Sequence, residues 1–416
     1  MTEKVEVITL GCRLNTYESE VIKKKASDAG VSKTLIINTC AVTAEAERQA
    51  RQIIRREKRK KPDVDIIVTG CSAQINPQKW LKIPEVNRVL GNVEKLQSSS
   101  YLTSQDHPLA AVNDIMSVRE QAGHLISGFE GRARAFVQVQ QGCDHRCTFC
   151  VIPFGRGNSR SVPLGDIVAE ARTQVANGYR EIVLTGVDLT SYGHDLPGNP
   201  SLGQAVRRLL AAVPELPRLR LSSLDPSEID PDLMLLFASE PRLMPHLHLS
   251  VQSGDDLILK RMKRRHSRND VISVTKKLKD LRPEIVFGAD FIAGFPTETD
   301  DMFHNTLRLI DEAAITWLHV FPYSSRPNTP AAKMPQIPVS TRKIRAAELR
   351  GKGKIAAQKH LKNLVGSKVS VLLEGKGKGR SEDFANVNVK GNFAGIQVVE
   401  ALISHSDGVI AYGLPV

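Results

Sequence analysis

The sequence predicts an α/β protein in three parts: a parallel α/β sheet domain, a partial six-stranded βα barrel, and a small β module. Uniformly apolar runs alternate with helical patterns near the N-terminus, which indicates a parallel sheet covered on both faces. A second series of apolar runs and helices indicates a barrel, and short β segments with Gly turns follow it. At 416 residues the chain is longer than one hydrophobic core usually supports, so we expect several domains. We place them at 1–125, 126–362 and 363–416.

The composition favours an anionic partner inside the cell. The net charge is +12, which is typical of chains that bind nucleic acid, although a basic balance alone proves no binding. No basic leader precedes a long apolar stretch, and no run reaches the ~18 apolar residues of a membrane span. We therefore expect a cytoplasmic protein without membrane contact, whose six cysteines serve metal or redox chemistry.

In the first part, a cysteine follows each of three predicted strands. The runs "VEVITLGC", "TLIINTC" and "DIIVTGC" end at Cys12, Cys40 and Cys71. Because the carboxyl ends of parallel strands meet at one edge of a sheet, these cysteines are expected to converge there. Each could instead be a small buried apolar residue, but the threefold repetition at one structural position favours convergence.

A linker is expected at 96–128, and the barrel follows it. Its predicted strands are 135–140, 181–186, 218–223, 246–251, 285–294 and 317–324. Six strands fall short of the eight of a closed barrel, so an open barrel is expected. A long basic helix is predicted at 340–364, and β segments are predicted at 367–377, 384–391, 395–402 and 408–416.

The stretch "QQGCDHRCTFCVIPFGRGNSR", residues 140–160, contains Cys143, Cys147 and Cys150. Three thiolates in this spacing suit three irons of a 4Fe-4S cube and leave the fourth iron open. Zinc with His145 as a fourth ligand is the main alternative, but that site would be cramped and there is no second C-x2-C pair. Arg156 and Arg160 follow, either to screen a negative cluster or touch a phosphate, or on a solvated loop face.

A C-x3-C-x2-C motif after the first strand of an incomplete barrel resembles the radical S-adenosylmethionine (SAM) superfamily. The resemblance implies that the open iron binds the amino and carboxylate groups of SAM. It also implies reductive cleavage of SAM to methionine and a 5′-deoxyadenosyl radical. Positions that match cofactor contacts of later strands are Gly186, Asp188, Gln252 and Gly294.

Across nearly its full length the chain resembles the methylthiotransferases, through "TLGCRLNTYESE", "NTCAVTAEAERQARQ", "VTGCSAQ" and "FPYSSRPNTPAA" besides the cysteine loop. "NTCAVT" and "GCRLN" are more similar to the MtaB type, which acts on threonylcarbamoyladenosine in tRNA, than to the MiaB or RimO types. The resemblance implies that Cys12, Cys40 and Cys71 hold an auxiliary 4Fe-4S cluster. The implied reaction consumes two SAM molecules and installs a methylthio group on carbon 2 of the adenine at tRNA position 37.

No acid–base pair or nucleophile is conspicuous in the sequence. Direct abstraction of a hydrogen atom from carbon would require none.

The expected partners are the tRNA anticodon stem-loop, an electron donor such as a flavodoxin or ferredoxin, and a sulfur donor. Two basic segments could track an RNA backbone or form solvated helix faces. The predicted RNA contacts are Arg55, Arg56, Lys260, Arg261, Lys263 and Arg264. The C-terminal module resembles the TRAM domain that these enzymes often carry for RNA binding.

Two alternatives stay open from the sequence. The same chemistry could act on isopentenyladenosine in tRNA or on an aspartate of a ribosomal protein. A protein of another class, a non-catalytic iron–sulfur RNA-binding or electron-transfer protein, would keep the clusters without transferase activity. The six predicted barrel strands with a C-x3-C-x2-C loop argue against that class.

Overall fold

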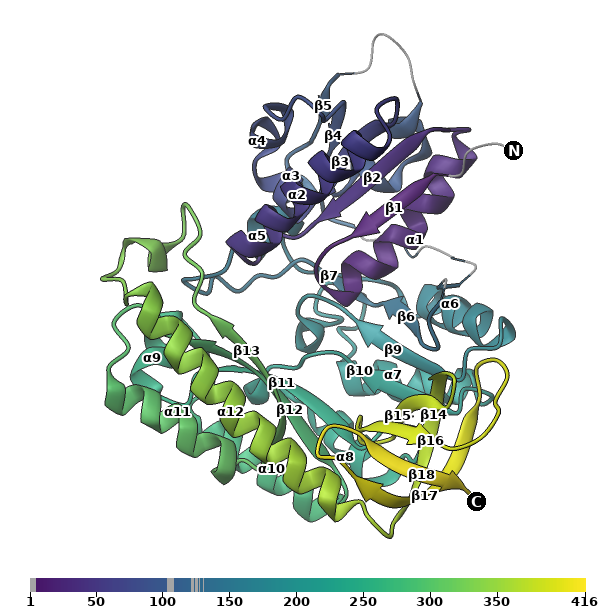
Figure 1. Cartoon of the computed structure of the whole chain (residues 1–416), viewed down its shortest axis with the longest axis vertical. Coiled ribbons are helices and arrows are strands. Elements are labelled where there is room, and N and C mark those ends of the chain that lie inside the picture. The colour runs from purple at the N-terminus through teal and green to yellow at the C-terminus, as the bar shows by residue number, and fades with distance from the viewer. Residues whose placement is uncertain (1–4, 103–107, 121–122, 124–125, 127, 130) are drawn as a thin grey trace.

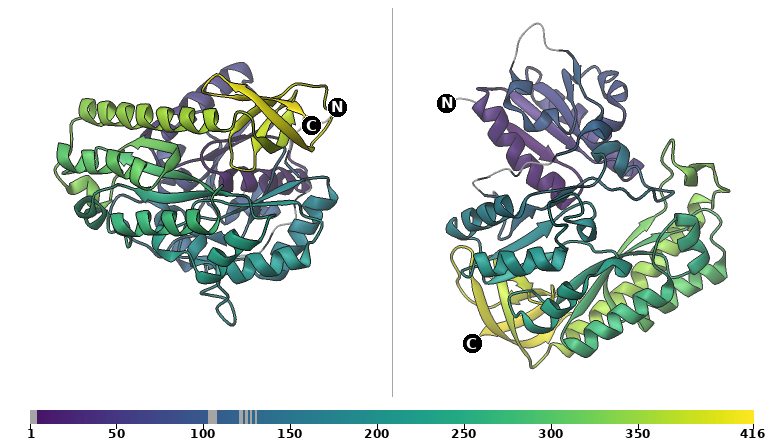
Figure 2. Two further views of the ribbon diagram at one scale, coloured as in Figure 1. Left: turned by 90° about the horizontal axis from the view of Figure 1, so that it is seen from below. Right: turned by 180° about the vertical axis from the view of Figure 1, so that it is seen from behind.

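The computed structural model describes residues 5–102, 108–120, 123, 126, 128–129 and 131–416. Three β structures follow one another along the chain (Figure 1). The N-terminal sheet and the C-terminal barrel lie at opposite ends of the molecule in Figure 1 and in the right-hand view of Figure 2. The strands of the central half-barrel lie between them, so this part contacts both neighbours.

The N-terminal sheet has five parallel strands in sequence order. They are β1 (Glu6–Thr9), β2 (Thr34–Thr39), β3 (Asp65–Gly70), β4 (Arg88–Leu90) and β5 (Ala110–Ala111). The edge strand β5 lies inside the stretch predicted as a linker, and that prediction is wrong there. A strand of two residues is too short to show the alternation by which strands are recognised in a sequence.

Helices cover both faces of this sheet, as predicted. Leu35 and Ile37 of β2 pack on one side with Ile54 of α2, whereas Ile36 packs on the other with Ile22 of α1. Side chains alternate between the faces of a strand, so a strand buried on both faces is apolar throughout. The helical segments here are α1 (Arg13–Asp28), α2 (Ala44–Lys60), α3 (Cys71–Ile75), α4 (Pro77–Leu81), η1 (Glu94–Leu96), η2 (Ser98–Tyr101) and η3 (Ile115–Ser117).

The central part is an open arrangement of six parallel strands, which confirms the prediction of a partial barrel. Three strands pair as β10-β9-β6 and three as β11-β12-β13, and isolated bridges such as Leu224–Leu249 join the two halves. The strands are β6 (Ala135–Gln138), β9 (Glu181–Thr185), β10 (Arg218–Leu221), β11 (His246–Gln252), β12 (Val286–Ala293) and β13 (Ile315–Pro322).

Helices cover one face of these strands and leave the other face to polar residues. Phe287, Ala289 and Phe291 of β12 join the core with residues of α10, α11 and α12, whereas Gly288 and Asp290 point the other way. A short antiparallel pair, β7 (Gln140–Gln141) and β8 (Arg160–Ser161), flanks the cysteine loop. No helix among the described residues is long and apolar enough to cross a membrane.

The helical segments of this part are α5 (Ile152–Arg156), α6 (Leu164–Ala176), η4 (Leu189–Ser191), α7 (Leu202–Ala212), η5 (Pro226–Glu228), α8 (Pro231–Ser239), α9 (Asp256–Met262), α10 (Arg268–Leu281), α11 (Asp300–Glu312), η6 (Pro330–Lys333) and α12 (Val339–Asn363). The basic helix predicted at 340–364 corresponds to α12. It packs along β13 and leads to the C-terminal strands (Figure 2).

The C-terminal part is a closed five-stranded barrel in the order β14-β15-β16-β18-β17. The sequence predicted four of these strands and missed β15, because "KGRS" carries no apolar pattern. Phe384, between β15 and β16, stacks on His246 at the start of β11, with ring centroids 4.9 Å apart. The strands are β14 (Lys368–Gly375), β15 (Lys378–Ser381), β16 (Asn386–Val389), β17 (Val398–Ser406) and β18 (Ala411–Pro415).

A buried carboxylate, Glu181, organises this contact between the two barrels. It pairs with Arg220 at 2.8 Å, with Arg218 at 3.0 Å and with Arg134. Arg220 also donates to the backbone oxygens of Ser381 and Glu382 at the end of β15. Burial raises the pKa of Glu181, but the three guanidinium groups, Arg220 first, outweigh it and lower this pKa to about 2. The C-terminal barrel is therefore fastened to the amino ends of the central strands.

Replacement of Glu181 by Gln should lower the free energy of unfolding by about 3 kcal/mol at pH 7, because it leaves buried guanidinium groups without their counter-charge. A carboxylate with a depressed pKa stabilises the fold above its unfolded pKa, and that contribution is lost as the pH falls toward 2. Urea denaturation at several pH values measures both effects. Glu45→Gln, on the exposed face of α2, is the control and should not shift the midpoint. An equal midpoint for Glu181→Gln would contradict the prediction.

Candidate functional site

Cys12, Cys40 and Cys71 lie at the carboxyl edge of the N-terminal sheet. Cys12 precedes α1, Cys40 follows β2 and Cys71 begins α3. The strand register pairs Thr39 with Gly70, so Cys40 and Cys71 leave neighbouring strands at the same level. A Cβ at Gly11 would lie 2.8 Å from Cys40 Cβ, which shows how closely the turn before Cys12 approaches Cys40. The strand pattern predicted this convergence.

The three thiols have no covalent partner and lie close enough to influence one another. Burial raises the pKa of Cys40 to about 12, and the thiols of Cys71 and Cys12 raise it further. Metal coordination replaces the proton of a thiol, so a metal that binds here would have to displace the proton of Cys40. Their other neighbours are amides: Asn92 Nδ2 lies 3.9 Å from Cys71 Sγ, and Asn15 Oδ1 lies 3.9 Å from Cys12 Sγ.

Cys143, Cys147 and Cys150 lie on the loop between β7 and α5. Gly142 starts this loop with φ at +74°, and a Cβ there would lie 1.8 Å from the backbone oxygen of Asn158, so only glycine fits. The backbone nitrogen of Thr148 donates to the oxygen of Met262 at 3.0 Å, which fastens the loop to the end of α9. The loop is thus held from two sides.

Charged and polar groups surround the second set of thiols. Asp188 Oδ2 lies 3.6 Å from Cys143 Sγ, and Arg264 Nη1 lies 3.6 Å from Cys147 Sγ. The backbone nitrogen of Ile152 donates to Cys150 Sγ at 3.4 Å. The two donors, Arg264 and the backbone nitrogen of Ile152, stabilise sulfur atoms that carry negative charge. Burial and the carboxylate of Asp188, which accepts from the Cys143 thiol, instead raise the pKa of Cys143.

The spacing of the sulfur atoms distinguishes a cluster from a single ion. Cys143, His145 and Asp188 have ligand atoms within 4.8 Å of one another, a spacing that one ion would accept. Among the described residues, neither set of three cysteines is that compact. The thiolates of a cube bind different irons and need not approach each other so closely, so both sets fit a cluster with one open iron better than they fit zinc.

A buried ion network joins the two sets of cysteines. Arg156, on α5 after the cysteine loop, donates to both carboxylate oxygens of Glu18 on α1, at 2.7 and 2.9 Å. Lys95 Nζ reaches the same carboxylate at 2.7 Å, and Arg156 also donates to Asn15 and Gln141. All three charged side chains are at most 1% exposed.

Two basic side chains share one carboxylate in this network, which leaves an excess positive charge beside Cys71 when both are protonated. Burial lowers the pKa of Lys95, and the carboxylate of Glu18 opposes this shift. Burial raises the pKa of Glu18, but Arg156 and Lys95 outweigh it and lower this pKa to about 2. Burial lowers the pKa of Arg156, but Cys71 and Glu18 outweigh it and raise this pKa well above its ordinary value. Deprotonated sulfur at Cys71 would compensate the second cation. This charge balance fits a negatively charged group held by Cys12, Cys40 and Cys71.

Direct packing also brings the two sets together. Val151, which follows Cys150, is buried with Ala41 and Cys71 in one small apolar cluster. Gly155 lies so close to α3 that its Cβ would be 3.2 Å from Cys71 Cβ. Helix α5, which follows Cys150, therefore packs on α3, which begins with Cys71.

The structure places the residues predicted to contact SAM at the ends of three strands. Gly186 and Asp188 follow β9, and Gln140 Oε1 accepts hydrogen bonds from the backbone nitrogens of Val187 and Asp188 at 2.9 and 2.8 Å. Asp188 thereby reaches Cys143. Gln252 ends β11 with φ at +68°. Gly294 follows β12 and lies against Arg342 of α12; the ring of its neighbour Phe295 contacts that of Phe149 in the cysteine loop.

The predicted basic residues divide into two groups. Arg55 and Arg56 on α2 and Lys260 and Lys263 at the end of α9 are exposed, as an RNA contact requires. Arg261 donates to Thr297 and is half-buried.

The side chain of Arg264 is 9% exposed and bound to Asp225 and Cys147, which does not support its predicted RNA contact. Arg156 and Arg160 are also buried, so the alternative of a solvated loop face is wrong for them. Arg160 donates to the backbone oxygens of Asn158 and Arg156.

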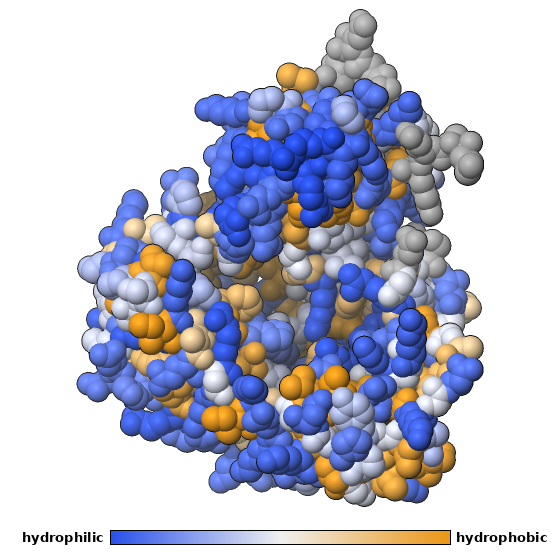
Figure 3. Space-filling view, viewed as in Figure 1, coloured by the Kyte–Doolittle hydropathy of each residue, from blue (hydrophilic) through white to orange (hydrophobic). Residues whose placement is uncertain are grey.

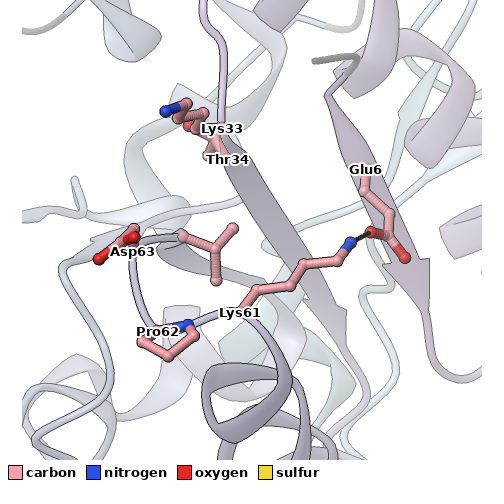
Figure 4. A pocket seen from close by; sticks show the side chains of 7 residues that line it. Glu6, Lys33, Thr34, Lys61, Pro62 and Asp63 are labelled. Atoms are coloured by element: carbon pink, nitrogen blue, oxygen red, sulfur yellow. Dashed lines mark hydrogen bonds and ion pairs between the residues drawn. The ribbon is translucent and has the colours of Figure 1, made fainter.

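A hollow opens between the N-terminal sheet and the two barrels (Figure 3). A separate cavity of about 440 Å³ lies at the amino ends of β1 and β2, lined by Glu6, Lys33, Thr34 and Lys61 (Figure 4). Lys61 extends across it to Glu6 at 2.7 Å. Since the cysteines lie at the carboxyl ends of the same strands, this cavity is remote from them.

Two family models match the parts of the chain that carry the cysteines. The model described as "Radical SAM superfamily" matches residues 137–310, and that described as "Uncharacterized protein family UPF0004" matches residues 4–91. A protein of Rickettsia prowazekii (strain Madrid E), threonylcarbamoyladenosine tRNA methylthiotransferase MtaB, is 54% identical over 397 residues, covering 95% of this chain and 94% of that protein. This chain belongs to the radical SAM methylthiotransferase family. Its cofactors therefore include SAM and a 4Fe-4S cluster.

Other relatives of this chain have lower sequence identity to it. The MtaB protein of Thermotoga maritima is 35% identical, covering 95% of this chain and 92% of that protein. A tRNA-2-methylthio-N(6)-dimethylallyladenosine synthase of Sorangium cellulosum is 34% identical, covering 91% and 83%. The solved radical SAM methyltransferase TsrM from Kitasatospora setae has a TM-score of 0.59 at 15% identity, covering 80% of this chain and 77% of TsrM, a likeness of fold alone.

Sequence reasoning missed Asn15, Glu18 and Lys95. Asn15 and Glu18 follow Cys12 at intervals of three residues, which places all of them on one face of α1. That spacing was available as a signal. The sequence around Lys95 carried no such signal, because nothing in it shows that this lysine is fully buried.

Arg156→Lys should loosen the packing of α5 on α3, because a lysine ammonium cannot bind Glu18, Asn15 and Gln141 together. In metal-free protein, alkylation of Cys71, which is 4% exposed, should become at least about tenfold faster, equivalent to ~1.4 kcal/mol of easier local opening. Peptide mass spectrometry after timed iodoacetamide treatment measures this rate. Arg172→Lys on α6 is the control, and equal Cys71 rates in both variants would refute the role of Arg156.

Proposed function

We propose that this methylthiotransferase adds a methylthio group to carbon 2 of threonylcarbamoyladenosine at position 37 of tRNA. The observation that carries the proposal is the identity of 54%, over 95% of the chain, with a relative of that name. The net charge of +12 supports a nucleic-acid substrate. We expect the reaction to occur in the cytoplasm, on the anticodon stem-loop.

In this proposal residues 1–125 hold the auxiliary 4Fe-4S cluster through Cys12, Cys40 and Cys71. Residues 126–362 hold the SAM-binding cluster through Cys143, Cys147 and Cys150. Residues 363–416 cover the amino ends of the central strands. When bound, the SAM-binding cluster with one SAM would supply the radical that removes the hydrogen from carbon 2, the auxiliary cluster would supply the sulfur, and a second SAM would supply its methyl group. An electron donor such as a flavodoxin or ferredoxin and a separate sulfur donor complete the requirements.

The protein's own side chains provide charge balance and exclusion of water. Arg156 and Lys95 offset negative charge near Cys71, and Arg264 does the same at Cys147. Val151 and Ala41 exclude water between the two sets of cysteines, which protects reactive species from side reactions. Asp188 and Gly186, beside Cys143, are proposed to contact SAM, and Gln252 and Gly294 are proposed to complete that site.

RNA binding is proposed for the exposed basic residues. Arg55 and Arg56 extend from α2, and Lys260 and Lys263 extend from α9, on the two parts that hold the cysteines. Contacts with phosphates would position the RNA without reading its sequence. We leave Arg264 out of this set because its guanidinium is bound to Asp225.

A second candidate substrate is an adenosine with an apolar N6 substituent. The relative from Sorangium cellulosum, named tRNA-2-methylthio-N(6)-dimethylallyladenosine synthase, covers 91% of the chain but is only 34% identical. The lower identity makes this candidate the weaker one.

Incubation of anaerobically reconstituted protein with SAM, reductant and tRNA tests the substrate directly. We expect nucleoside mass spectrometry to show the methylthio derivative of threonylcarbamoyladenosine in tRNA that carries this nucleoside. tRNA with isopentenyladenosine should stay unchanged. A product from the isopentenyl substrate alone would reverse the assignment, and intact clusters without any 5′-deoxyadenosine would favour a non-catalytic iron–sulfur protein.

Two cysteine variants separate the proposed roles of the clusters. Reconstituted protein should contain about eight iron atoms per chain if it holds two cubes, and Cys147→Ala and Cys40→Ala should each lose about half. Cys147→Ala should abolish 5′-deoxyadenosine formation, whereas Cys40→Ala should retain part of it and lose methylthiolation. Each variant is the control for the other. Full methylthiolation by Cys40→Ala would remove the auxiliary cluster from the proposal.

A further inference from the structure

A group of ionisable side chains that the cysteine chemistry does not use lies on the helix-free face of the central strands. His248 Nε2 lies 3.1 Å from Asp290 Oδ1, and His319 Nδ1 lies 3.3 Å from the same oxygen. The two imidazole rings are 4.7 Å apart. One residue comes from each of β11, β12 and β13, so three adjacent strands build the group.

Strand alternation explains why these side chains meet. Leu247 and Leu249 flank His248, and Ala289 and Phe291 flank Asp290; these four point into the helical core. His319 is the register partner of Asp290, whereas Gly288 is the register partner of His248. A Cβ at Gly288 would lie 2.6 Å from His248 Nδ1, so a side chain at this position would leave too little room for the imidazole.

The group is accessible to a ligand. The exposed fractions of the side chains are 55% for His319, 24% for Asp290 and 10% for His248, a gradient from solvent into the strands. His319 is more than half exposed, so the group is open to solvent on the helix-free face. A ligand that approaches the group from solvent would meet His319 first and Asp290 next.

Arg13 brings a positive charge from the N-terminal part toward the same face. It follows Cys12 directly and begins α1, and its side chain makes neither a hydrogen bond nor an ion pair with the described residues. Burial lowers the pKa of Arg13, Arg134 and Arg220 lower it further, and Asp290 and Glu181 oppose them. Helix α1 contacts β6, and its amino end, where Arg13 lies, is turned toward the central strands in Figures 1 and 2. The five guanidinium donors lack a partner among the described residues.

Arginines outnumber the carboxylates that they pair with near the amino ends of these strands. Glu181 binds three arginines, and one of them, Arg134, also pairs with Glu374, which leaves one positive charge in excess. Burial, Arg220, His248 and Arg13 together hold the pKa of His246 well below its usual range. Nε2 of His246, a residue 5% exposed, has no partner among the described residues. The ligand atoms of His248, Asp290 and His319 lie within 4.8 Å of one another, a spacing that one ion would accept, but the arginines nearby favour an anionic, hydrogen-bonding ligand over a cation.

We infer that Arg13 and the group of His248, Asp290 and His319 form the subsite for the polar N6 substituent of the substrate adenosine. This inference rests on the proposed function. A threonylcarbamoyl group carries a carboxylate, a hydroxyl group and urea N–H groups. The guanidinium of Arg13 suits the carboxylate through paired hydrogen bonds. Asp290 suits the hydroxyl or N–H donors, and the imidazoles hold Asp290 in place.

The subsite would also reject the apolar alternative. An isopentenyl group offers no hydrogen-bond acceptor, so its entry would leave Arg13 and Asp290 desolvated without a partner. Sites built to hydrogen-bond a substituent discriminate strongly against analogues that lack it. Arg13 adjoins Cys12, so recognition of the N6 substituent would place the adenine next to the proposed auxiliary cluster.

Binding of anticodon stem-loop RNA to the reconstituted holoenzyme tests the subsite without catalysis. Fluorescence anisotropy should show that the wild type prefers threonylcarbamoyladenosine over plain adenosine at position 37. Arg13→Gln should bind the modified loop about 10- to 100-fold more weakly, the loss expected for a charged hydrogen-bond pair, and bind the unmodified loop unchanged. Arg207→Gln, an exposed arginine on α7, is the matched control.

A second variant covers the case in which Arg13→Gln fails to fold. His319→Ala changes a half-exposed side chain and should reduce the preference for the modified loop severalfold. Unchanged preference in both folded variants overturns the subsite. Impaired SAM binding in Arg13→Gln, measured without RNA, would assign Arg13 to the cofactor and also overturn it. A wild type that prefers the isopentenyl loop would instead refute the proposed substrate.

Discussion

The buried ion pair between Arg156 and Glu18 holds the two cysteine-bearing parts of the protein in one arrangement. Both side chains are at most 1% exposed, and Lys95 adds a second buried cation. Charges removed from water in this way are tolerated only when their hydrogen bonds are satisfied, which fixes the geometry of their neighbours. Because Arg156 ends the helix after the cysteine loop and Glu18 follows Cys12 by six residues, the two cysteine sets cannot move independently.

The central strands separate three tasks by position. Their carboxyl ends carry the cysteine loop and Asp188, whereas their amino ends carry Glu181 and its arginines, which fasten the C-terminal barrel. The helix-free face between these ends carries His248, Asp290 and His319. Since the Ser381–Phe384 segment of the C-terminal barrel is occupied by this attachment, RNA binding by the module would have to use its other surfaces.

The sequence was sufficient for the parallel sheet, the open six-stranded barrel and the positions of all six cysteines. These follow from uniformly apolar strands and from the rule that the carboxyl ends of parallel strands share an edge. Glu18, Lys95 and Arg156 could not be recognised as one network, because each is an ordinary surface residue type whose burial depends on partners distant in the chain. The same holds for Asp290 and His319, which lie 29 positions apart and meet only through strand register. The short strands β5 and β15 were missed because they lack a periodic pattern.

The Arg156 network also sets an order of events during synthesis. A nascent chain that has emerged through residue 125 contains Glu18 and Lys95 but not the arginine that shares their carboxylate. Its first three cysteines are present, yet the surface that covers Cys71 has not been made, since Val151 and Gly155 come later. If the earlier cysteines hold the proposed auxiliary cluster, that set would be open to delivery of iron and sulfide until residues 151–155 are made, and the packing of these residues would then cover Cys71.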